Sequence, residues 1–245
     1  MKNTKNKIVL ITGGTGLIGE SIINEFIKCN YIVIFTYLKN KTKADKIMSL
    51  HKNIYAYKVK IENSSSIEKM LKSVNQKFGK LDVLINNAGI NKPEDFNKIK
   101  EKDWDKILAV NLKGPFLLMQ KTIYLLRKSN FPCVINISSV SGQYGGPRTA
   151  HYATSKAGLI SLSQVFARFA IQFGIRSNTI AVGLIESPLA QKGIKSPIVK
   201  KQLSNILQGR MGLPKEVADM CIFLSSEKSS YMTAQTINLN GGLYF

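Results

Sequence analysis

A tyrosine and a lysine stand four positions apart in the sequence, as Tyr152 and Lys156 of the stretch HYATSKAG at residues 151–158. Residues four apart share one face of a helix, so the lysine ammonium would lie beside the phenol and favour its ionised form. Lowering a tyrosine pKa from about 10 to about 7 takes roughly 4 kcal/mol. One unit charge at about 4 Å supplies that much at an effective dielectric constant of about 20. The pair therefore predicts a proton donor and acceptor near neutral pH, and a solvated helix face is the alternative.

A glycine-rich turn lies near the start of the chain, between an apolar run at residues 8–11 and a helical pattern at 20–28. Its sequence TGGTGLIG places Gly14, Gly16 and Gly19 in the order G-x-G-x-x-G. Such a turn between a strand and a helix lets the backbone approach a pyrophosphate at the helix N-terminus. A purely structural turn is the usual alternative, but this position and context favour dinucleotide binding.

Short apolar runs alternate with longer helical patterns along the whole sequence. The expected strands cover residues 8–11, 32–36, 54–59, 83–86, 134–137, 177–181 and 236–239, and the expected helices cover 20–28, 64–78, 104–128, 152–173 and 215–224. This alternation indicates parallel strands joined by crossover helices, and strand runs that are apolar on both faces indicate a sheet covered on both sides. We therefore expect an α/β protein with a single-domain Rossmann fold over residues 1–245. It would contain a doubly wound parallel sheet of about seven strands with helices on both faces, and a substrate loop at 183–214.

The composition is that of a globular protein. The chain has 245 residues and is 44% hydrophobic, enough for a sizeable core. Its apolar runs fall far short of the roughly 18 residues that span a bilayer, and its basic start is not followed by a secretory signal, so we expect a cytoplasmic protein without membrane attachment. Three widely spaced cysteines argue against a disulfide framework or a zinc site, so we expect reduced thiols and no metal.

The net charge of +20 comes from 35 Lys and Arg residues against 15 Asp and Glu residues. Such a charge raises the possibility of nucleic-acid or membrane binding. Only five of the basic residues are arginines, which are scattered along the chain, while lysine, isoleucine and asparagine are all abundant. Base and phosphate recognition relies on arginine forks, so a solvated basic surface is favoured over a specific nucleic-acid site. An acidic partner could still be attracted by the charge.

Further motifs accompany the Tyr152 and Lys156 pair. The sequence NNAG at residues 86–89 follows an expected strand, Asn111 is expected to open a helix, and Ser139 ends the run at 134–137. Together with the glycine turn, these motifs resemble the short-chain dehydrogenase/reductase family over essentially the whole chain. The segments 210–218, 223–226 and 235–242 are similar to its 3-oxoacyl-[acyl-carrier-protein] reductase branch.

The resemblance implies a catalytic set of Asn111, Ser139, Tyr152 and Lys156. Tyr152 would give its proton to a carbonyl oxygen as a hydride arrives, and Ser139 would hydrogen-bond that oxygen. Lys156 would lower the tyrosine pKa and hold the nicotinamide ribose, while Asn111 would anchor a water relay. Taken singly, Ser139 could be a turn residue and Asn111 a helix cap.

The resemblance also implies a set of cofactor contacts. They are Gly13, Thr15, Gly16, Leu17, Ile18 and Gly19 in the turn; Thr36 and Lys39 after the second strand; Lys60 and Ile61 after the third; Asn87, Ala88 and Gly89 after the fourth; Tyr152 and Lys156; and Gly183, Ile185 and Ser187 after the sixth.

The chain departs from the family pattern in several places. Leu17 occupies the middle glycine position of the turn, as in the longer sugar-nucleotide branch, and Val182 replaces a proline. Lys60 replaces an aspartate that commonly meets the adenine amino group, and a lysine cannot accept that hydrogen bond. Its backbone or a neighbour must substitute.

Cofactor choice depends on the end of the second strand, where NAD enzymes carry an acid for the ribose 2'-hydroxyl. Residues 36–39 read TYLK, with no acid before Asp45. We therefore expect NADP(H) to be favoured over NAD(H), with Lys39 and Thr36 near the 2'-phosphate.

Three functions remain open. The first is reduction of a 3-oxoacyl group on an acyl carrier protein, although Phe173 stands where such enzymes often carry a basic residue; Arg127 and Lys128 lie close to a second such position. The second is reduction of a modified sugar or small ketone of secondary metabolism, and the third a non-catalytic dinucleotide-binding regulatory protein. The resemblance further implies a homotetramer. His51 and His151 are expected at the surface or in loops.

Overall fold

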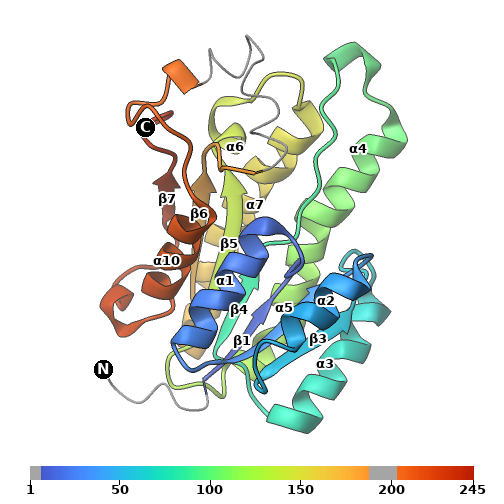
Figure 1. Cartoon of the computed structure of the whole chain (residues 1–245), viewed down its shortest axis with the longest axis vertical. Helices are drawn as coiled ribbons and strands as arrows, with labels where there is room; N and C mark the ends of the chain where they lie inside the picture. The colour runs from blue at the N-terminus through green and yellow to red at the C-terminus, as the bar shows by residue number, and fades with distance from the viewer. Residues whose placement is uncertain (1–6, 188–202) are drawn as a thin grey trace.

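The computed structural model describes residues 7–187 and 203–245, and its centre is one seven-stranded parallel sheet (Figure 1). The strands are β1 (Ile8–Ile11), β2 (Ile32–Tyr37), β3 (Ile54–Lys58), β4 (Val83–Asn86), β5 (Cys133–Ser139), β6 (Arg176–Val182) and β7 (Thr236–Leu239). Their order across the sheet is β3-β2-β1-β4-β5-β6-β7, and every neighbouring pair is parallel. The predicted α/β Rossmann-type fold is confirmed.

Helices connect the strands. They are α1 (Leu17–Lys28), α2 (Lys41–Met48), α3 (Ser64–Phe78), α4 (Glu101–Leu108), α5 (Gly114–Leu126), α6 (Ser141–Tyr144), α7 (Ala150–Ala170) and α10 (Pro214–Leu224). Short 3-10 turns occupy Phe96–Lys98, Ile171–Phe173 and Glu227–Ser229, and a π-helical turn occupies Ala109–Lys113.

Two hydrophobic layers cover the two faces of the sheet. One layer joins alternate strand residues such as Val9 and Ile11 to α1, α2 and α10, with Phe26 and Cys221 fully buried in it. The other joins Leu10 and its counterparts to α3, α5 and α7. Successive side chains of a strand point to opposite faces of the sheet, so each strand contributes residues to both hydrophobic layers. The sheet is therefore covered on both sides, as predicted.

Burial of the strands differs between the centre of the sheet and its edges. All residues of β1, β4, β5 and β6 are buried, whereas β3 and β7, which form the two edges, are only partly so. The expectation that each strand is apolar on both faces holds for β1. It is wrong for β6, which begins with the buried polar run 176–179, and for β7, where Thr236 and Asn238 interrupt the pattern.

Helix α2 was not predicted, because its eight residues bury only Ala44 and Ile47. Its start depends on a local cap instead, since the Asn40 side chain accepts a hydrogen bond from the Lys43 N–H at 3.0 Å. A short polar helix of this kind has too few apolar positions to show a period.

The helix expected at 104–128 is two helices joined by a π-helical turn. It begins earlier, at Glu101, and the turn between α4 and α5 contains Asn111. The prediction that Asn111 opens a helix is therefore wrong, because Asn111 lies inside a continuous helical segment. Widened turns of this kind occur often at functional sites.

Much of the loop predicted at 183–214 falls at residues 188–202, outside the described residues. Its described ends meet in a short parallel bridge between Ile185 and Gly212, where the Glu186 N–H donates to the Gly212 carbonyl at 2.9 Å. In the described part of the chain, no helix combines the length and apolar character needed to cross a bilayer.

Candidate active site

The glycine turn follows β1 at the carboxyl edge of the sheet, where parallel sheets bind ligands. A Cβ on Gly19 would lie 2.4 Å from the Gly13 carbonyl oxygen, and one on Gly14 would lie 2.5 Å from the Phe35 ring. Gly13 has a φ of +69°, a conformation that disfavours side chains. Gly16 is the N-cap of α1 and supplies no side-chain cap to the first turn. The backbone donors of that turn therefore have no intrahelical partner.

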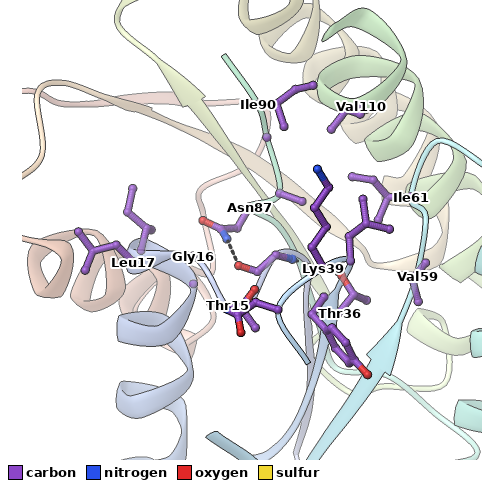
Figure 2. A pocket seen from close by; sticks show the side chains of 18 of the residues that line it. Thr15, Gly16, Leu17, Thr36, Lys39, Val59, Ile61, Asn87, Ile90 and Val110 are labelled. Carbon is purple, nitrogen blue, oxygen red and sulfur yellow. Dashed lines mark hydrogen bonds between the residues drawn. The ribbon is translucent and has the colours of Figure 1, made fainter. Parts of the chain in front are cut away.

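Side chains from neighbouring strands hold the turn in place. The Thr12 hydroxyl accepts hydrogen bonds from the N–H groups of Asn87 and Ala88 at 3.0 and 2.9 Å. The Asn87 amide donates to the carbonyl of Thr12 at 2.8 Å and to that of Gly13 at 3.3 Å, and Figure 2 shows it directed at the turn. From β2, the Thr36 hydroxyl accepts from the Gly13 N–H at 3.2 Å. Thr36 is thus engaged with the turn.

A cleft of about 700 Å³ extends from the turn along the ends of β1 to β4 (Figure 2). Of the predicted cofactor contacts, it is lined by Gly13, Thr15, Gly16, Leu17, Ile18, Gly19, Thr36, Lys39, Ile61, Asn87, Ala88, Gly89, Ile185 and Ser187. It is also lined by nine residues that the sequence did not single out as contacts, namely Tyr37, Leu38, Asn40, Val59, Glu62, Ile90, Lys106, Val110 and Glu186.

Lys60 does not line this cleft, contrary to expectation, although its neighbours Val59, Ile61 and Glu62 do. Its side chain is exposed, and its backbone N–H donates to the Ser66 hydroxyl at 3.0 Å. The chain leaves β3 in a turn here, in which the Asn63 N–H donates to the Lys60 carbonyl at 2.9 Å, and Lys60 faces solvent while Val59 and Ile61 line the cleft.

A smaller inner pocket of about 250 Å³ adjoins the cleft and contains Ser139, Tyr152, Lys156 and Gly183. The two cavities share five lining residues, which are Ile18, Asn87, Gly89, Ile90 and Ile185. They therefore form one continuous site, with its wide end at β2 and β3 and its narrow end at β5, β6 and α7.

Close contacts fix α7 against the end of β5. The Ser138 hydroxyl donates to the Lys156 carbonyl at 2.8 Å. A Cβ on Gly142 of α6 would lie 2.7 Å from the Lys156 backbone carbon, so only a glycine permits this approach. The first turns of α7, which carry Tyr152 and Lys156, are held by the same strand that ends in Ser139.

The Ser139 and Tyr152 hydroxyl groups interact with each other in the inner pocket. The Tyr152 pKa is raised above its ordinary value, mainly by burial, while the interaction with Ser139 lowers it. Contrary to the expectation that Lys156 makes this phenol more acidic, the Tyr152 pKa is raised, and Lys156 is not among the groups that lower it. The phenol is fully protonated at neutral pH, the state required of a proton donor.

The Lys156 side chain is almost fully buried, with 4% of its surface exposed. Its ammonium donates to the Ile137 carbonyl at 2.7 Å and lies 5.7 Å from the centre of the Tyr152 ring. Burial lowers the Lys156 pKa to about 8. The group is therefore mostly charged at pH 7 and close to its titration point.

Asn111 connects the π-helical turn to the loop after β4. Its side-chain oxygen accepts from the Ile90 N–H, and its amide donates to the Ile90 carbonyl, both at 2.9 Å. The amide also donates to the Ser155 hydroxyl at 3.1 Å, and that hydroxyl donates to the Tyr152 carbonyl at 2.7 Å. Asn111 thus links two segments that line the inner pocket.

His151 is fully buried, so its expected surface position is wrong. Its Nδ1 accepts from the Tyr152 N–H at 3.0 Å, and its Nε2 has no hydrogen-bond partner in the described residues. The sequence around His151, which directly precedes Tyr152, contains no pattern that predicts its burial. His51 is exposed, as expected.

No group of three or more His, Cys, Asp or Glu side chains in residues 7–187 and 203–245 is arranged to hold a metal. Cys29, Cys133 and Cys221 are free thiols.

The residues present fit a dinucleotide. The uncapped first turn of α1 offers backbone donors to a pyrophosphate. Lys39 extends into the cleft in Figure 2 and forms no ion pair with another described residue. The volume of about 700 Å³ lies within the usual range for cofactor sites. The turn and Asn87 would hold the pyrophosphate, and the inner pocket would receive the nicotinamide end.

Comparison with known proteins agrees with this geometry. A family model described as Enoyl-(Acyl carrier protein) reductase matches residues 16–244. The chain is 36% identical over 243 residues to the 3-oxoacyl-[acyl-carrier-protein] reductase of Thermotoga maritima, with 98% of each chain covered. It is 35% identical over 248 residues to the enzyme of the same name from Staphylococcus aureus, covering 100% of both, and 32% identical to that of Vibrio cholerae, covering 99% of both.

The family model and the relatives are named after different reactions, so the matches indicate a family rather than one substrate. The matches to the named enzymes extend over essentially the full length of the chain. The chain therefore belongs to the short-chain dehydrogenase/reductase family and is an oxidoreductase of that family acting on a carbonyl group with a nicotinamide cofactor.

Proposed function

We propose that the protein reduces the 3-oxo group of an acyl chain carried by acyl carrier protein to a 3-hydroxyl group, using NADPH. The observation that carries this proposal is the inner pocket, where Ser139, Tyr152 and Lys156 surround the end of a cleft suited to a dinucleotide. The relatives from three bacteria are all named for this reaction.

The described residues are arranged to protonate a carbonyl oxygen. A reduced nicotinamide, when bound, supplies the hydride. Ser139 and Tyr152 each carry a hydroxyl at the same point of the pocket, so both can donate to one substrate oxygen as its negative charge develops. Tyr152 then gives up its proton, and the Lys156 ammonium stabilises the phenolate that forms. Asn111 keeps the loop after β4 in place around this point.

The preference for NADPH is supported by the end of β2. Lys39 lines the cleft there, and no acidic residue stands in residues 36–39 to bind a ribose 2'-hydroxyl. The Thr36 hydroxyl already accepts from the turn, so Lys39 is the group that would meet a 2'-phosphate.

An acidic carrier is supported by the basic character of the surface. A groove of about 600 Å³ between α3 and α5 is lined by Lys72, Arg127 and the ion pair of Lys121 with Glu68, and the chain as a whole carries a net charge of +20. This charge would speed the encounter with an acidic protein.

The deciding experiment follows NADPH absorbance with acetoacetyl-acyl carrier protein, acetoacetyl-coenzyme A and a panel of small ketones and keto-sugars. We expect turnover of both thioesters, faster with the carrier protein. Turnover confined to small ketones or keto-sugars would instead support a reductase of secondary metabolism. Tight NADPH binding without turnover of any substrate would indicate a non-catalytic regulatory protein.

We also propose that the protein is a homotetramer. The exposed side chains of Phe116 on α5 and Val165 on α7 line a shallow groove that also includes residues of α4, and β7 is a partly buried edge strand. Other copies of the chain would cover the groove and the exposed edge of β7. Light scattering after gel filtration should give four times the chain mass, and Val165→Glu should give a smaller species.

A further inference from the structure

Glu62 and Lys106 form an ion pair at the wide end of the cleft, where neither residue was expected from the sequence. Both line the cleft, and the Lys106 ammonium is hydrogen-bonded to the Glu62 carboxylate. Only 10% of the Glu62 side chain is exposed, against 49% of that of Lys106. A carboxylate this buried is costly unless it is paired, so its place in the cleft calls for an explanation.

The surroundings of this pair suit a flat aromatic group with a polar edge. Val59, Ile61 and Val110 provide apolar walls next to Glu62. The narrow end of the site takes the nicotinamide, so the other half of a dinucleotide, the adenosine, extends toward β2 and β3. The adenine ring would therefore lie between these walls.

The position of Glu62 is fixed by its neighbours along the chain. Ile61 packs against Gly114, where an added Cβ would lie 3.1 Å from the Ile61 side chain. Asn63 caps α3 by accepting from the Ser66 N–H at 2.8 Å. The carboxylate is held between these anchors before any ligand binds, which reduces the ordering cost of binding.

The charge state of Glu62 suits an acceptor. The ion pair with Lys106 and a bond from its own backbone N–H hold the Glu62 pKa below its usual value, against the opposing effect of burial. An ionised carboxylate has about four acceptor positions, so these two bonds leave capacity for another donor. The neighbouring ammonium also neutralises the carboxylate, which limits its repulsion of the cofactor phosphates.

We propose that Glu62, held by Lys106, accepts a hydrogen bond from the adenine amino group of the cofactor. It thereby takes the role that Lys60 cannot fill, because Lys60 is outside the cleft and has no acceptor. The proposal rests on the proposed use of a nicotinamide adenine dinucleotide and adds the residue that recognises its base.

The test compares NADPH with reduced nicotinamide hypoxanthine dinucleotide phosphate, in which a carbonyl oxygen replaces the adenine amino group. Affinities are measured by calorimetric titration, without a carbonyl substrate. The wild-type protein should bind the hypoxanthine analogue about tenfold more weakly, because Glu62 would face an acceptor instead of a donor. In Glu62→Gln the difference should fall below about twofold, since an amide can donate to the oxygen or accept from the amino group.

Two further variants control for general effects. Glu68→Gln also removes a carboxylate paired with a lysine, Lys121, but outside the cleft, and it should keep the tenfold difference. Lys106→Gln should weaken binding of both dinucleotides while retaining discrimination. If Glu62→Gln folds poorly, the Lys106→Gln variant still tests the role of the ion pair between Glu62 and Lys106.

The outcomes separate this inference from the proposed function. Equal and tight binding of both dinucleotides by the wild-type protein would overturn the role of Glu62 and leave the reductase proposal intact. Discrimination that persists in Glu62→Gln would also overturn it. Failure of the wild-type protein to bind either dinucleotide would overturn both.

Discussion

The Lys156 ammonium donates a hydrogen bond to the Ile137 carbonyl at 2.7 Å, so strand β5 sets its position. The ammonium is buried next to the Tyr152 ring instead of pairing with a carboxylate. This arrangement holds a charge where a phenolate will form, and it lowers the lysine pKa to about 8. Two measurable consequences follow, one for activity and one for stability.

Reduction should lose rate as pH rises through about 8. The folded-state pKa of Lys156 is about 8, so the ammonium that stabilises the phenolate is present below this pH and absent above it. We expect kcat/KM for reduction to be level between pH 6 and 7.5 and to fall about tenfold per pH unit above about 8.5. A profile that stays level to pH 10 would contradict the role given to Lys156.

Replacing Lys156 with methionine should stabilise the fold while abolishing activity. Folding lowers the pKa of Lys156 from 10.5 to about 8, so the unfolded chain binds the proton of the lysine ammonium more tightly than the folded protein does. The charged lysine therefore destabilises the folded state below pH 8. The pKa difference corresponds to roughly 3 kcal/mol, from which loss of the bond to Ile137 removes about 1 kcal/mol. Urea unfolding should show Lys156→Met more stable by about 2 kcal/mol at pH 7. The gain should shrink toward pH 10, and equal gains at both pH values would rule out the charge as its cause.

The Tyr152→Phe variant should lower the reduction rate by about 10²–10⁴-fold, because it removes the proton donor and keeps the ring. NADPH affinity, measured by titration, should change less than about threefold. Ser139→Ala, which keeps the donor and loses one hydrogen bond to the oxygen, should be impaired less. An unchanged rate in Tyr152→Phe would remove this residue from the reaction.

Asn111→Ala should lower the free energy of unfolding by about 2–4 kcal/mol. Asn111 is fully buried, and the change removes its two hydrogen bonds to the Ile90 backbone and its hydrogen bond to the Ser155 hydroxyl, each of which contributes about 1 kcal/mol. Asn75→Ala, at an exposed position of α3, is the matched control and should change stability by less than about 0.5 kcal/mol. Similar values for the two variants in chemical denaturation would show that Asn111 does not fix this loop.

Lys39→Glu should reverse the cofactor preference. It removes the cation facing a 2'-phosphate and adds an acid suited to a ribose 2'-hydroxyl, so the ratio of initial rates with NADPH and NADH, at equal subsaturating concentrations, should fall at least about tenfold. Lys52→Glu, an exposed position away from the cleft, controls for net charge. Higher rates with NADH in the wild-type protein would show that the NADPH proposal is wrong.

Local sequence patterns were sufficient to predict the strands, most of the helices and the order of these elements along the chain. The glycine turn, the buried runs of β1, β4, β5 and β6, and the pair Tyr152 and Lys156 follow from residue type and spacing, because steric limits and side-chain direction act over a few residues. The resemblance to a family then added Ser139 and Asn111, which no local rule would connect to the pair.

Only the tertiary structure decided how these residues meet and in what environment. Burial, which depends on segments distant in sequence, raised the Tyr152 pKa where the spacing alone predicted a lower one. It also placed His151 inside the protein. The turn of Lys60 out of the cleft and the pairing of Glu62 with Lys106, 44 residues away, have the same origin. A sequence fixes which neighbours a side chain has along the chain, whereas desolvation and charge pairing depend on neighbours that packing brings together.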